Sequence, residues 1–404
     1  MAEDRVILHC DCNSFFASVE TALHPAFRNV PMAVCGNEEE RHGIVLAKNE
    51  LAKSFGIQTA ETVVSARRKC PSLVIAEPHY EEYVKYSKAV SEIYARFTDA
   101  IEPFSIDESW LDVTASKKLF GTGEQIADTI RETVRKEIGI TISVGVSFNK
   151  VFAKLGSDYK KPDATTVISR ENYQKIVYPL PATDMIFVGA HTGEMLRTMG
   201  IRTIGDLAAA SPDLLVMRLG KMGEMLSRYA RGEDDSPVAP RTEARKSISN
   251  GFTFIRDLVG REECRQGIEF LCEEIGTKLR RQEMKATVVS LKIKDVFLRT
   301  VQKQATLDPP TDLTKEISEA AYCLLCSMWS ENKPARMLTV SVSGLLQKEA
   351  QTEQLTLFPD ETQQKRREKD GKRDVAIDAI RDRFGVSAIQ SGASIREDGI
   401  FKKK

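Results

Sequence analysis

Three acidic residues in two distant segments could together hold divalent cations. Asp11 follows an apolar run, and Asp107 and Glu108 are neighbours in the segment EPFSIDESWLDV. Magnesium takes oxygen ligands, and two ions roughly 4 Å apart can stabilise both the attacking and the leaving oxygen of a nucleotidyl transfer. Single aspartates at strand ends and adjacent acidic pairs are also common as turn and surface residues. The residue types alone therefore leave nucleotidyl transfer as one interpretation among others.

The sequence around these acids predicts elements that could bring them together. The residues before Asp11 are apolar and a helical pattern follows, so Asp11 is expected at the C-terminal end of a strand. Adjacent strand residues point to opposite faces, so Asp107 and Glu108 can reach one site only if the chain turns there, as in a hairpin. By the same alternation Cys10 and Cys12 point away from Asp11, and we interpret their side chains as core.

Elsewhere the chain alternates between strand and helix patterns. Residues 140–148 alternate strictly, and the helix expected from Asn149 ends at Pro162. A helical stretch from about 166 to 232 leads into the polar linker GEDDSPVAPRTEA, after which strands and two helices are expected up to about residue 347. A chain of 404 residues is too long for one core. We therefore expect an α+β multidomain protein.

The composition is that of an ordinary soluble protein. The chain is 42% hydrophobic and 29% charged, with a formal net charge of zero. It contains no apolar run near the roughly 20 residues that span a bilayer, and its N-terminus lacks the layout of a signal peptide. We therefore expect no membrane association and a cytoplasmic location. Cys323 and Cys326 form a CxxC without a second pair, so we interpret them as a buried helix face rather than as zinc ligands.

Basic residues are concentrated between 241 and 303 although the whole chain is neutral. Several fall at strand-like spacing and could line one face that holds nucleic-acid phosphates, and a solvated surface is the alternative. They are Arg241, Arg245, Lys246, Lys278, Arg280, Arg281, Lys285, Lys292, Lys294, Arg299 and Lys303.

Three motifs in a fixed order carry a family resemblance. DCNSFFASVE begins at Asp11, SIDESWLD contains Asp107 and Glu108, and SVGVSFNKVFAKLGSDYKKP follows. Together they resemble the Y family of DNA polymerases, the DinB/UmuC group, from about residue 5 to 358. The resemblance implies a low-fidelity, template-directed DNA polymerase for translesion synthesis. It also implies a right-hand architecture with a ferredoxin-like palm, small fingers, a helical thumb with a helix-hairpin-helix, and an α+β little finger.

The resemblance implies domain boundaries as well. The palm would comprise 1–30 and 78–165, the fingers 31–77, the thumb 166–238 and the little finger 239–347, followed by a flexible tail at 348–404. Within the tail we expect a short helix around residues 375–384. It would be either a basic patch or a solvated helix whose Ile377, Ile380 and Phe384 form a docking face.

The resemblance assigns the palm acids to catalysis. Asp11, Asp107 and Glu108 would hold two Mg²⁺ ions, together with the backbone carbonyl of Cys12. The 3′-hydroxyl of a primer would attack a dNTP and release pyrophosphate. A non-catalytic accessory protein is disfavoured because all three acids are present. Another two-metal enzyme, such as a cyclase, would leave the remaining motifs unexplained.

Aromatic and basic residues would bind the incoming nucleotide. Phe16 corresponds to the family's steric gate against a ribose 2′-hydroxyl, with Phe15 beside it, and plain core packing is the alternative for Phe16. Lys53 and Lys161 correspond to triphosphate contacts. Glu50 and Lys53 stand where DinB-type members have a tyrosine and an arginine, so the subfamily stays open between DinB-like and UmuC-like.

Further residues would hold the primer-template. VGAHTGEMLRTMGIRTIGDLA resembles a helix-hairpin-helix in which Gly189 would face a DNA phosphate, and Phe187 replaces the usual first glycine. The expected contacts of the little finger are Arg245 and Lys246 to the template strand, and Lys292, Lys294, Arg299 and Lys303 to backbone phosphates.

A short apolar segment interrupts the polar tail. Gln354, Leu355, Leu357 and Phe358 belong to QLTLF, which resembles the peptide with which bacterial polymerases bind the sliding clamp. Two apolar anchors presented by a disordered segment suit such binding. The expected partners of a monomeric enzyme are therefore primer-template DNA, dNTP and the sliding clamp.

Overall fold

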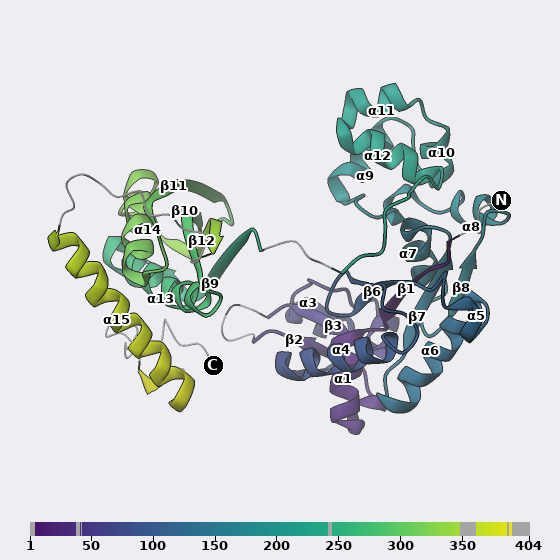
Figure 1. The fold of residues 1–404 in the computed structure, drawn as a ribbon, viewed down its shortest axis with the longest axis horizontal. Helices are drawn as coiled ribbons and strands as arrows, with labels where there is room; N and C mark the ends of the chain where they lie inside the picture. Colours follow the sequence, from purple (N-terminus) through teal and green to yellow (C-terminus); the bar gives the residue numbers. More distant parts are fainter. Residues whose placement is uncertain are drawn as a thin grey trace. The chain divides into compact units, whose positions relative to one another are not determined.

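The computed structural model describes residues 5–37, 41, 43–240, 245–347, 361–385, 388 and 389. The chain forms two compact units, residues 1–37 with 43–242 and residues 38–42 with 243–404, and each has its own sheets and core (Figure 1). Across the described residues, no helix combines the length and the apolar character needed to cross a bilayer.

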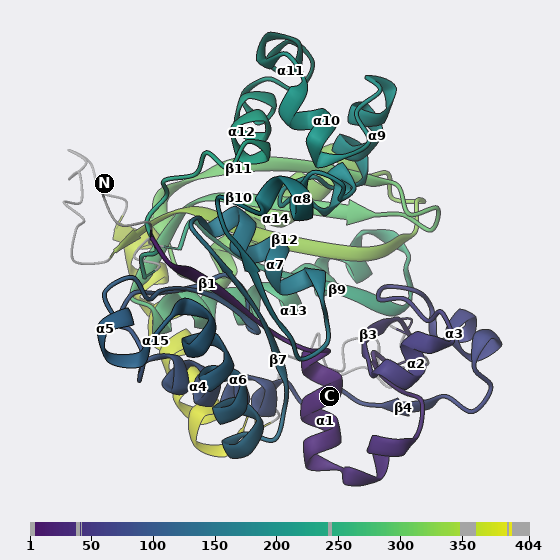
Figure 2. The ribbon, with the colours of Figure 1, turned by 90° about the vertical axis from the view of Figure 1, so that its right-hand side faces the viewer.

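A five-stranded sheet forms the centre of the first unit. Its order is β5 (Ile101–Pro103), β6 (Glu108–Asp112), β1 (Ile7–Cys12), β7 (Ile142–Ser147) and β8 (Thr165–Ile168). One face carries α1 (Phe15–Leu23), α4 (Tyr80–Tyr94) and α6 (Gly123–Glu137), and the other carries α7 (Lys150–Tyr159); a short α5 (Lys117–Phe120) precedes α6 (Figure 2). β1 is the central strand and all of its residues are buried. Its side chains alternate between the core under α4 and α6 and the face under α7.

Gly145 allows α7 to lie close to this sheet. A Cβ at position 145 would come within 1.9 Å of the Ala153 carbonyl oxygen and 2.5 Å of the Ser157 nitrogen, both in α7. The side chain of Asn149 caps the start of the helix by accepting a hydrogen bond from the Phe152 N–H. Strand β7 and helix α7 are therefore in direct backbone contact.

Two smaller groups of elements complete the first unit. One is a three-stranded sheet in the order β3 (Val45–Lys48), β2 (Met32–Cys35) and β4 (Val74–Ala76), with η1 (Pro25–Asn29), α2 (Glu50–Ser54) and α3 (Val63–Lys69). The other is helical and contains α8 (Tyr173–Val177), η2 (Ala182–Asp184), α9 (Ala190–Thr198), α10 (Ile204–Ala209), α11 (Pro212–Leu219) and α12 (Lys221–Ala230). Phe152 and Leu155 of α7 belong to the core of this helical group, so α7 is packed on two sides.

The second unit is built on a four-stranded antiparallel sheet. Its order is β11 (Thr300–Thr311), β10 (Met284–Lys294), β12 (Ala335–Gln347) and β9 (Ser247–Leu258). Helices α13 (Gly260–Arg281) and α14 (Thr314–Met328) cover one face and bury an apolar core. In β10, Val289, Leu291 and Ile293 face this core, so Lys292 and Lys294 project from the opposite, open face.

A long C-terminal helix is attached to α13 and α14. α15 spans Glu361–Phe384, so it begins well before the expected position near residue 375, and it lies alongside α13 and α14 in Figure 1. Arg280 of α13 pairs with Asp374 at 3.2 Å and with Asp378 at 2.6 Å, and Arg367 of α15 pairs with Glu316 of α14 at 2.8 Å. The helix is therefore bound by charged side chains.

Two helix faces were expected from apolar spacing. On α15, Ile380 and Phe384 are exposed and Ile377 lies on the bound side, so the choice between a basic patch and a docking face stays open. Cys323 and Cys326 are exposed on α14 rather than buried. The expectation of a buried face at these cysteines is wrong, because the packed side of α14 is formed by Ile317, Ala321, Leu324 and Leu325 instead.

Candidate active site

Asp11 and Glu108 face each other on neighbouring strands. They are directly opposite in the antiparallel pair of β1 and β6, so their side chains project from the same face. β5 and β6 form a tight hairpin in which the Phe104 and Ser105 N–H groups donate to the Glu108 carbonyl oxygen. The turn expected next to Asp107 is therefore confirmed.

Asp107 lies in this turn, beside the acidic pair. The Cys12 N–H donates to the Asp107 carbonyl oxygen at 3.0 Å, and the Asp107 carboxylate accepts a 2.6 Å hydrogen bond from Ser105 Oγ. Burial raises the pKa of Asp107, and the charges of Asp11 and Glu108 raise it further. The three acids singled out in the sequence are therefore electrostatically coupled.

Two lysines from α7 and the segment after it pair with these acids. Lys154 Nζ lies 3.0 Å from Asp11 Oδ2 and 3.1 Å from Glu108 Oε2. Lys161 Nζ lies 2.7 Å from the same Asp11 oxygen and 2.8 Å from Asp158 Oδ1. Burial alone would lower the pKa of Lys154, but the charges of Asp11, Asp158 and Glu108 raise it above its usual range. Both ammonium groups therefore remain charged between the carboxylates.

His9 lies on the same face of β1 as Asp11 and is fully buried. Its Nε2 is 3.3 Å from Glu108 Oε2, and its Nδ1 is 2.8 Å from Ser157 Oγ. Burial lowers the pKa of His9, which favours the neutral ring near neutral pH. Burial alone would raise the pKa of Glu108, but the contact with His9 and the charge of Lys154 lower it to about 2.

The donors at this site suit a hard divalent cation. Within the described ranges, one ligand atom each from His9, Asp11 and Glu108 lie within 4.8 Å of one another. Glu108 Oε2 is buried without a well-directed hydrogen bond, and the Lys154 ammonium 3.1 Å away already supplies positive charge at this oxygen. Carboxylate oxygens favour Mg²⁺ or Mn²⁺ over zinc, which prefers sulfur and nitrogen. The residues therefore fit a divalent metal ion.

Phe15 and Phe16 begin α1 in different surroundings. Phe15 is buried in the core, whereas Phe16 is half-buried and stacks on Tyr83 with ring centroids 4.2 Å apart. Exposed Tyr80 meets the Phe16 ring edge-on at 5.9 Å. Phe15 already fills the core position, so core packing alone does not account for the partly open ring of Phe16.

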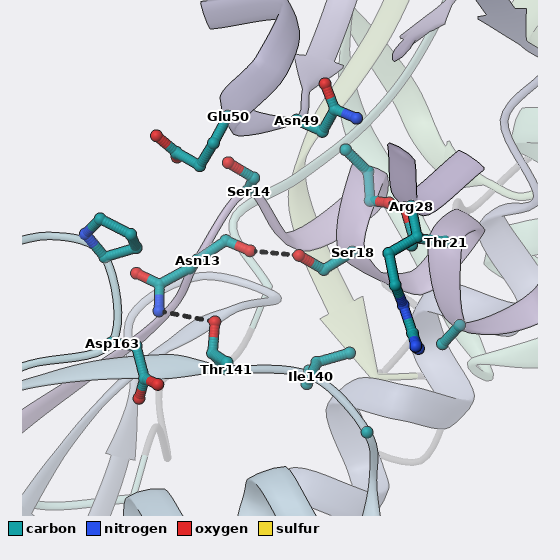
Figure 3. Close-up of a pocket in the computed structure, with 14 residues that line it drawn as sticks. Asn13, Ser14, Ser18, Thr21, Arg28, Asn49, Glu50, Ile140, Thr141 and Asp163 are labelled. Carbon is teal, nitrogen blue, oxygen red and sulfur yellow. Dashed lines mark hydrogen bonds between the residues drawn. The ribbon is translucent and has the colours of Figure 1, made fainter. Parts of the chain in front are cut away.

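A polar pocket of about 340 Å³ opens next to the start of α1 (Figure 3). Ser18 Oγ donates to the Asn13 carbonyl oxygen at 2.6 Å, and the Asn13 amide donates to Thr141 Oγ1 at 3.1 Å. Glu50 and Asp163 also line the pocket. Arg28 lines the pocket as well, so the lining carries charges of both signs (Figure 3).

The two lysines expected at the triphosphate differ in placement. Lys161 contacts Asp11, as described above, whereas Lys53 is exposed on α2 and pairs with Glu50 at 3.5 Å. Only Lys161 therefore contacts the predicted catalytic acids.

Comparisons with known proteins identify the family. The model of the impB/mucB/samB family matches residues 10–158, and the model of its C-terminal domain matches residues 245–357. The DNA polymerase IV of Acetivibrio thermocellus is 44% identical over 399 residues, which cover 98% of this chain and 99% of that protein. This chain belongs to the impB/mucB/samB family, the Y-family DNA polymerases.

Other similar proteins agree with this Y-family membership. The DNA polymerase IV of Moorella thermoacetica is 36% identical and covers 99% of both chains, and DNA polymerase IV 1 of Bacillus subtilis is 34% identical over 98% of this chain and 94% of that protein. A solved Y-family DNA polymerase chimera has a TM-score of 0.76 at 21% identity, covering 85% of this chain and 99% of that chain. The expected right-hand architecture of palm, fingers, thumb and little finger is confirmed.

The basic residues of the Y-family little finger do not all share one face. Lys292 and Lys294 project from the open face of the sheet. Lys303 is opposite Leu291 and so lies on the helix-covered face, where its Nζ is 3.3 Å from the Ser327 carbonyl oxygen. The expectation of one shared basic face is therefore wrong for Lys303. The other expected contacts are exposed: Arg245 and Lys246 before β9, and Arg299 between β10 and β11.

The open face of this sheet is rich in hydroxyl groups. Several small polar residues, which come from all four strands, project from the same face of the sheet as Lys292 and Lys294. These are Ser249, Ser290, Thr300, Thr339 and Ser341. Hydroxyl and ammonium groups bind phosphate and sugar oxygens without reading bases. The face therefore has the chemistry for sequence-independent DNA binding.

The expected helix-hairpin-helix starts with the short 3₁₀ helix η2. Phe187 in the hairpin has a φ of 70°, in the left-handed region that costs a non-glycine residue about 1–2 kcal/mol. Gly189 is the N-cap of α9, and a Cβ there would meet no atom within 4 Å. Because residue 189 is a glycine, no side chain at this position covers the first backbone N–H groups of α9.

Sequence reasoning missed three residues of the site: His9, Lys154 and Ser157. His9 precedes Asp11 by two positions, so strand alternation alone could have placed it on the same face. Lys154 and Ser157 required knowledge of which side of α7 meets the sheet, and that is set by the close approach at Gly145.

Proposed function

We propose that this chain catalyses template-directed, low-fidelity DNA synthesis across lesions, adding dNTPs to a primer 3′-hydroxyl with release of pyrophosphate. The observation that carries the proposal is the pairing of Asp11 with Glu108 on facing strands of a Y-family fold, with Asp107 in the adjoining turn. Relatives that are 34% and 44% identical over nearly their whole length are named DNA polymerase IV, which supports a DinB-like activity.

Asp11, Asp107 and Glu108 would hold two Mg²⁺ ions, with the Cys12 backbone carbonyl as a further ligand. Such ions, when bound, stabilise charge on the attacking and leaving oxygens. The chain's own contribution is to hold the ligands in place. Strand pairing sets Asp11 opposite Glu108, and the backbone hydrogen bond from Cys12 to Asp107 fixes the turn.

The incoming nucleotide would be held by Lys53, Lys161, Phe15 and Phe16. Lys161 lies next to Asp11, so it would neutralise phosphate charge close to the metal ligands. The Phe16 ring is fixed by stacking and would exclude a ribose 2′-hydroxyl, with Phe15 supporting α1 from the core. Lys53 would have to exchange its exposed pairing with Glu50 for a phosphate, at little cost.

The primer-template would be held through its phosphates. The contacts would come from Gly189 in the thumb, from Arg245 and Lys246 before β9, and from Lys292, Lys294 and Arg299 of the little finger. All of these residues are exposed except Lys294, which is half-buried. Lys303 would contribute least because it faces α14. We propose a monomeric enzyme that acts on nucleoid DNA in the cytoplasm.

The peptide at Gln354, Leu355, Leu357 and Phe358 lies outside the described residues. We propose that it binds the sliding clamp, supported by its apolar anchors in a polar segment. Deleting residues 354–358 should shorten the products made on clamp-loaded DNA and leave distributive synthesis without the clamp unchanged. Equal product lengths with the clamp, for the deletion and the wild type, would refute this binding.

Primer extension across a template abasic site, with Mg²⁺ and dNTPs, tests the proposed function. The wild type should insert opposite the lesion, and Asp107→Ala should be slower by on the order of a thousandfold, because several kcal/mol of charge stabilisation depend on the metal site. Fluorescence anisotropy should give the same DNA affinity for both proteins. Equal extension by both proteins would show that these acids do not form the active site.

A further inference from the structure

A chain of contacts joins Ser157 of α7 to Glu108 through His9. Ser157 Oγ lies 2.8 Å from His9 Nδ1, and His9 Nε2 lies 3.3 Å from Glu108 Oε2. His9 is 0% and Ser157 is 1% exposed, so water does not compete for these contacts. His9 Nε2 and Glu108 Oε2 are buried and lack any well-directed hydrogen bond in the described structure. A proton on His9 Nε2 therefore makes the contact with Glu108 Oε2 attractive, whereas a lone pair on Nε2 makes it repulsive.

Two arrangements of protons are possible for this chain of contacts. If Ser157 Oγ donates to the Lys154 carbonyl oxygen, 2.8 Å away, His9 carries its proton on Nδ1 and turns a lone pair toward the carboxylate. If Ser157 donates to Nδ1 instead, the proton is on His9 Nε2, which lies 3.3 Å from Glu108 Oε2. The Lys154 carbonyl keeps its helical N–H partner in either case, whereas a buried lone pair facing a carboxylate is costly. The second arrangement is therefore favoured.

The backbone holds the His9 ring in this orientation. Trp110 meets the ring edge-on with centroids 5.2 Å apart. Gly145 is the β7 residue opposite His9, and the absence of a side chain there lets α7 bring Ser157 within reach. The contact between Ser157 and His9 thus follows from the same close packing that places Lys154 beside the acids.

We propose that His9 is a positioning residue for Glu108. Its Nε2–H holds the carboxylate in the orientation that the metal site requires, and Ser157 fixes the tautomer that supplies this proton. The inference rests on the proposed function of Glu108 and adds two residues outside the three acids. Groups that orient metal ligands typically change metal affinity or activity by about 10–100-fold when they are removed.

Manganese binding to the full-length protein tests this role with a readout other than turnover. Free Mn²⁺ is measured by EPR in the complex with a dideoxy-terminated primer-template and dNTP. His9→Phe keeps a ring against Trp110 but has no N–H, and should raise the Mn²⁺ Kd about tenfold or more. His9→Gln keeps a donor and should stay near the wild type, and Ser157→Ala should fall between. In insertion assays His9→Phe should lower kcat about tenfold and leave the dNTP KM within about twofold.

The variants distinguish the possible failures. The inference is overturned if His9→Phe and Ser157→Ala both bind Mn²⁺ with wild-type affinity. It is also overturned if His9→Gln loses as much Mn²⁺ affinity as His9→Phe. If thermal unfolding shows that His9→Phe is not folded, Ser157→Ala decides alone, and a wild-type Kd overturns the inference. Glu108→Ala tests the proposed function separately, because an active Glu108→Ala variant refutes that function. If Glu108→Ala is inactive and His9→Phe binds Mn²⁺ like the wild type, only the role of His9 is refuted.

Discussion

At the residue scale, the acids of the palm are surrounded by positive charge. Two carboxylates as close as Asp11 and Glu108 would repel each other, and one would take up a proton. Lys154 and Lys161 offset this repulsion from distances of 2.7–3.1 Å. The acids and their spacing could be predicted from the sequence, since motif and strand pattern both mark them. The lysine that bridges them could not, because its position depends on how closely α7 approaches β7.

Phe16→Ala should admit ribonucleotides. The Phe16 ring is held by stacking on Tyr83, so removing it opens space next to α1 without opening the core that Phe15 fills. The insertion efficiency of a ribonucleotide relative to its deoxynucleotide should rise about a hundredfold, measured as the ratio of kcat/KM values. Phe15→Ala is the control and should lower the unfolding temperature while keeping sugar selectivity. Unchanged selectivity in Phe16→Ala would remove the gate assignment.

At the element scale, the palm elements followed from local patterns, whereas only the last part of the C-terminal helix, around residues 375–384, did so. Strand alternation and turn placement predicted the strand of Asp11 and the hairpin at Asp107. The bound face of α15 carries charged residues, namely Arg367, Asp370, Asp374, Asp378 and Arg381, with only Ile377 among them as an apolar residue. A helix that binds through charge has no apolar stripe to reveal it. Its partner Arg280 lies in a distant part of the sequence, so local patterns could not connect the two.

Arg280→Ala should detach α15. The Arg280 side chain is 9% exposed and pairs with Asp374 and Asp378, and breaking a buried ion pair costs about 3–5 kcal/mol. Hydrogen exchange measured by mass spectrometry should be faster by on the order of a hundredfold in residues 361–384. Arg281→Ala is the matched control, since that side chain is 59% exposed in its pair with Asp382 and should change little. Equal exchange in both variants would mean that the pairs of Arg280 do not hold the helix.

Acid should weaken the same attachment. Burial alone would raise the pKa of Asp378, but hydrogen bonds from Arg280 and Thr277 lower it below its usual value. The resulting stabilisation is complete above the unfolded pKa of about 3.9 and is lost as the pH falls through the folded value. Exchange in residues 361–384 should therefore accelerate below about pH 4 relative to the sheet of the same unit. A constant ratio between pH 5 and pH 3 would contradict this linkage.

At the scale of the whole molecule, DNA binding depends on which face of a sheet each basic residue occupies. The clustering of basic residues was visible in the sequence, but the strand register was not. A shift of one residue moves a side chain to the other face of a strand. Lys292 and Lys294 fall on the open face, and Lys303 on the face under α14.

Lys292→Ala and Lys294→Ala should each weaken DNA binding in a salt-dependent way. Each phosphate contact that is lost should reduce the slope of log K against log salt by about one. Lys303→Ala should leave the slope nearly unchanged because its ammonium faces Ser327. Anisotropy titrations of a primer-template over a range of salt concentrations measure all three. If Lys303→Ala reduces the slope as much as Lys292→Ala and Lys294→Ala do, then Lys303 also contacts a phosphate.

Single-nucleotide insertion by the wild type and by Asp11→Asn is the most direct test of the central claim, that the acids of β1 and of the β5–β6 turn form a polymerase active site. The substitution keeps the size of the side chain and removes a carboxylate that the metal site requires. With undamaged primer-template, Mg²⁺ and the complementary dNTP, the wild type should extend the primer by one nucleotide. Asp11→Asn should be slower by on the order of a thousandfold at unchanged DNA affinity. Extension by Asp11→Asn at the wild-type rate would contradict the account.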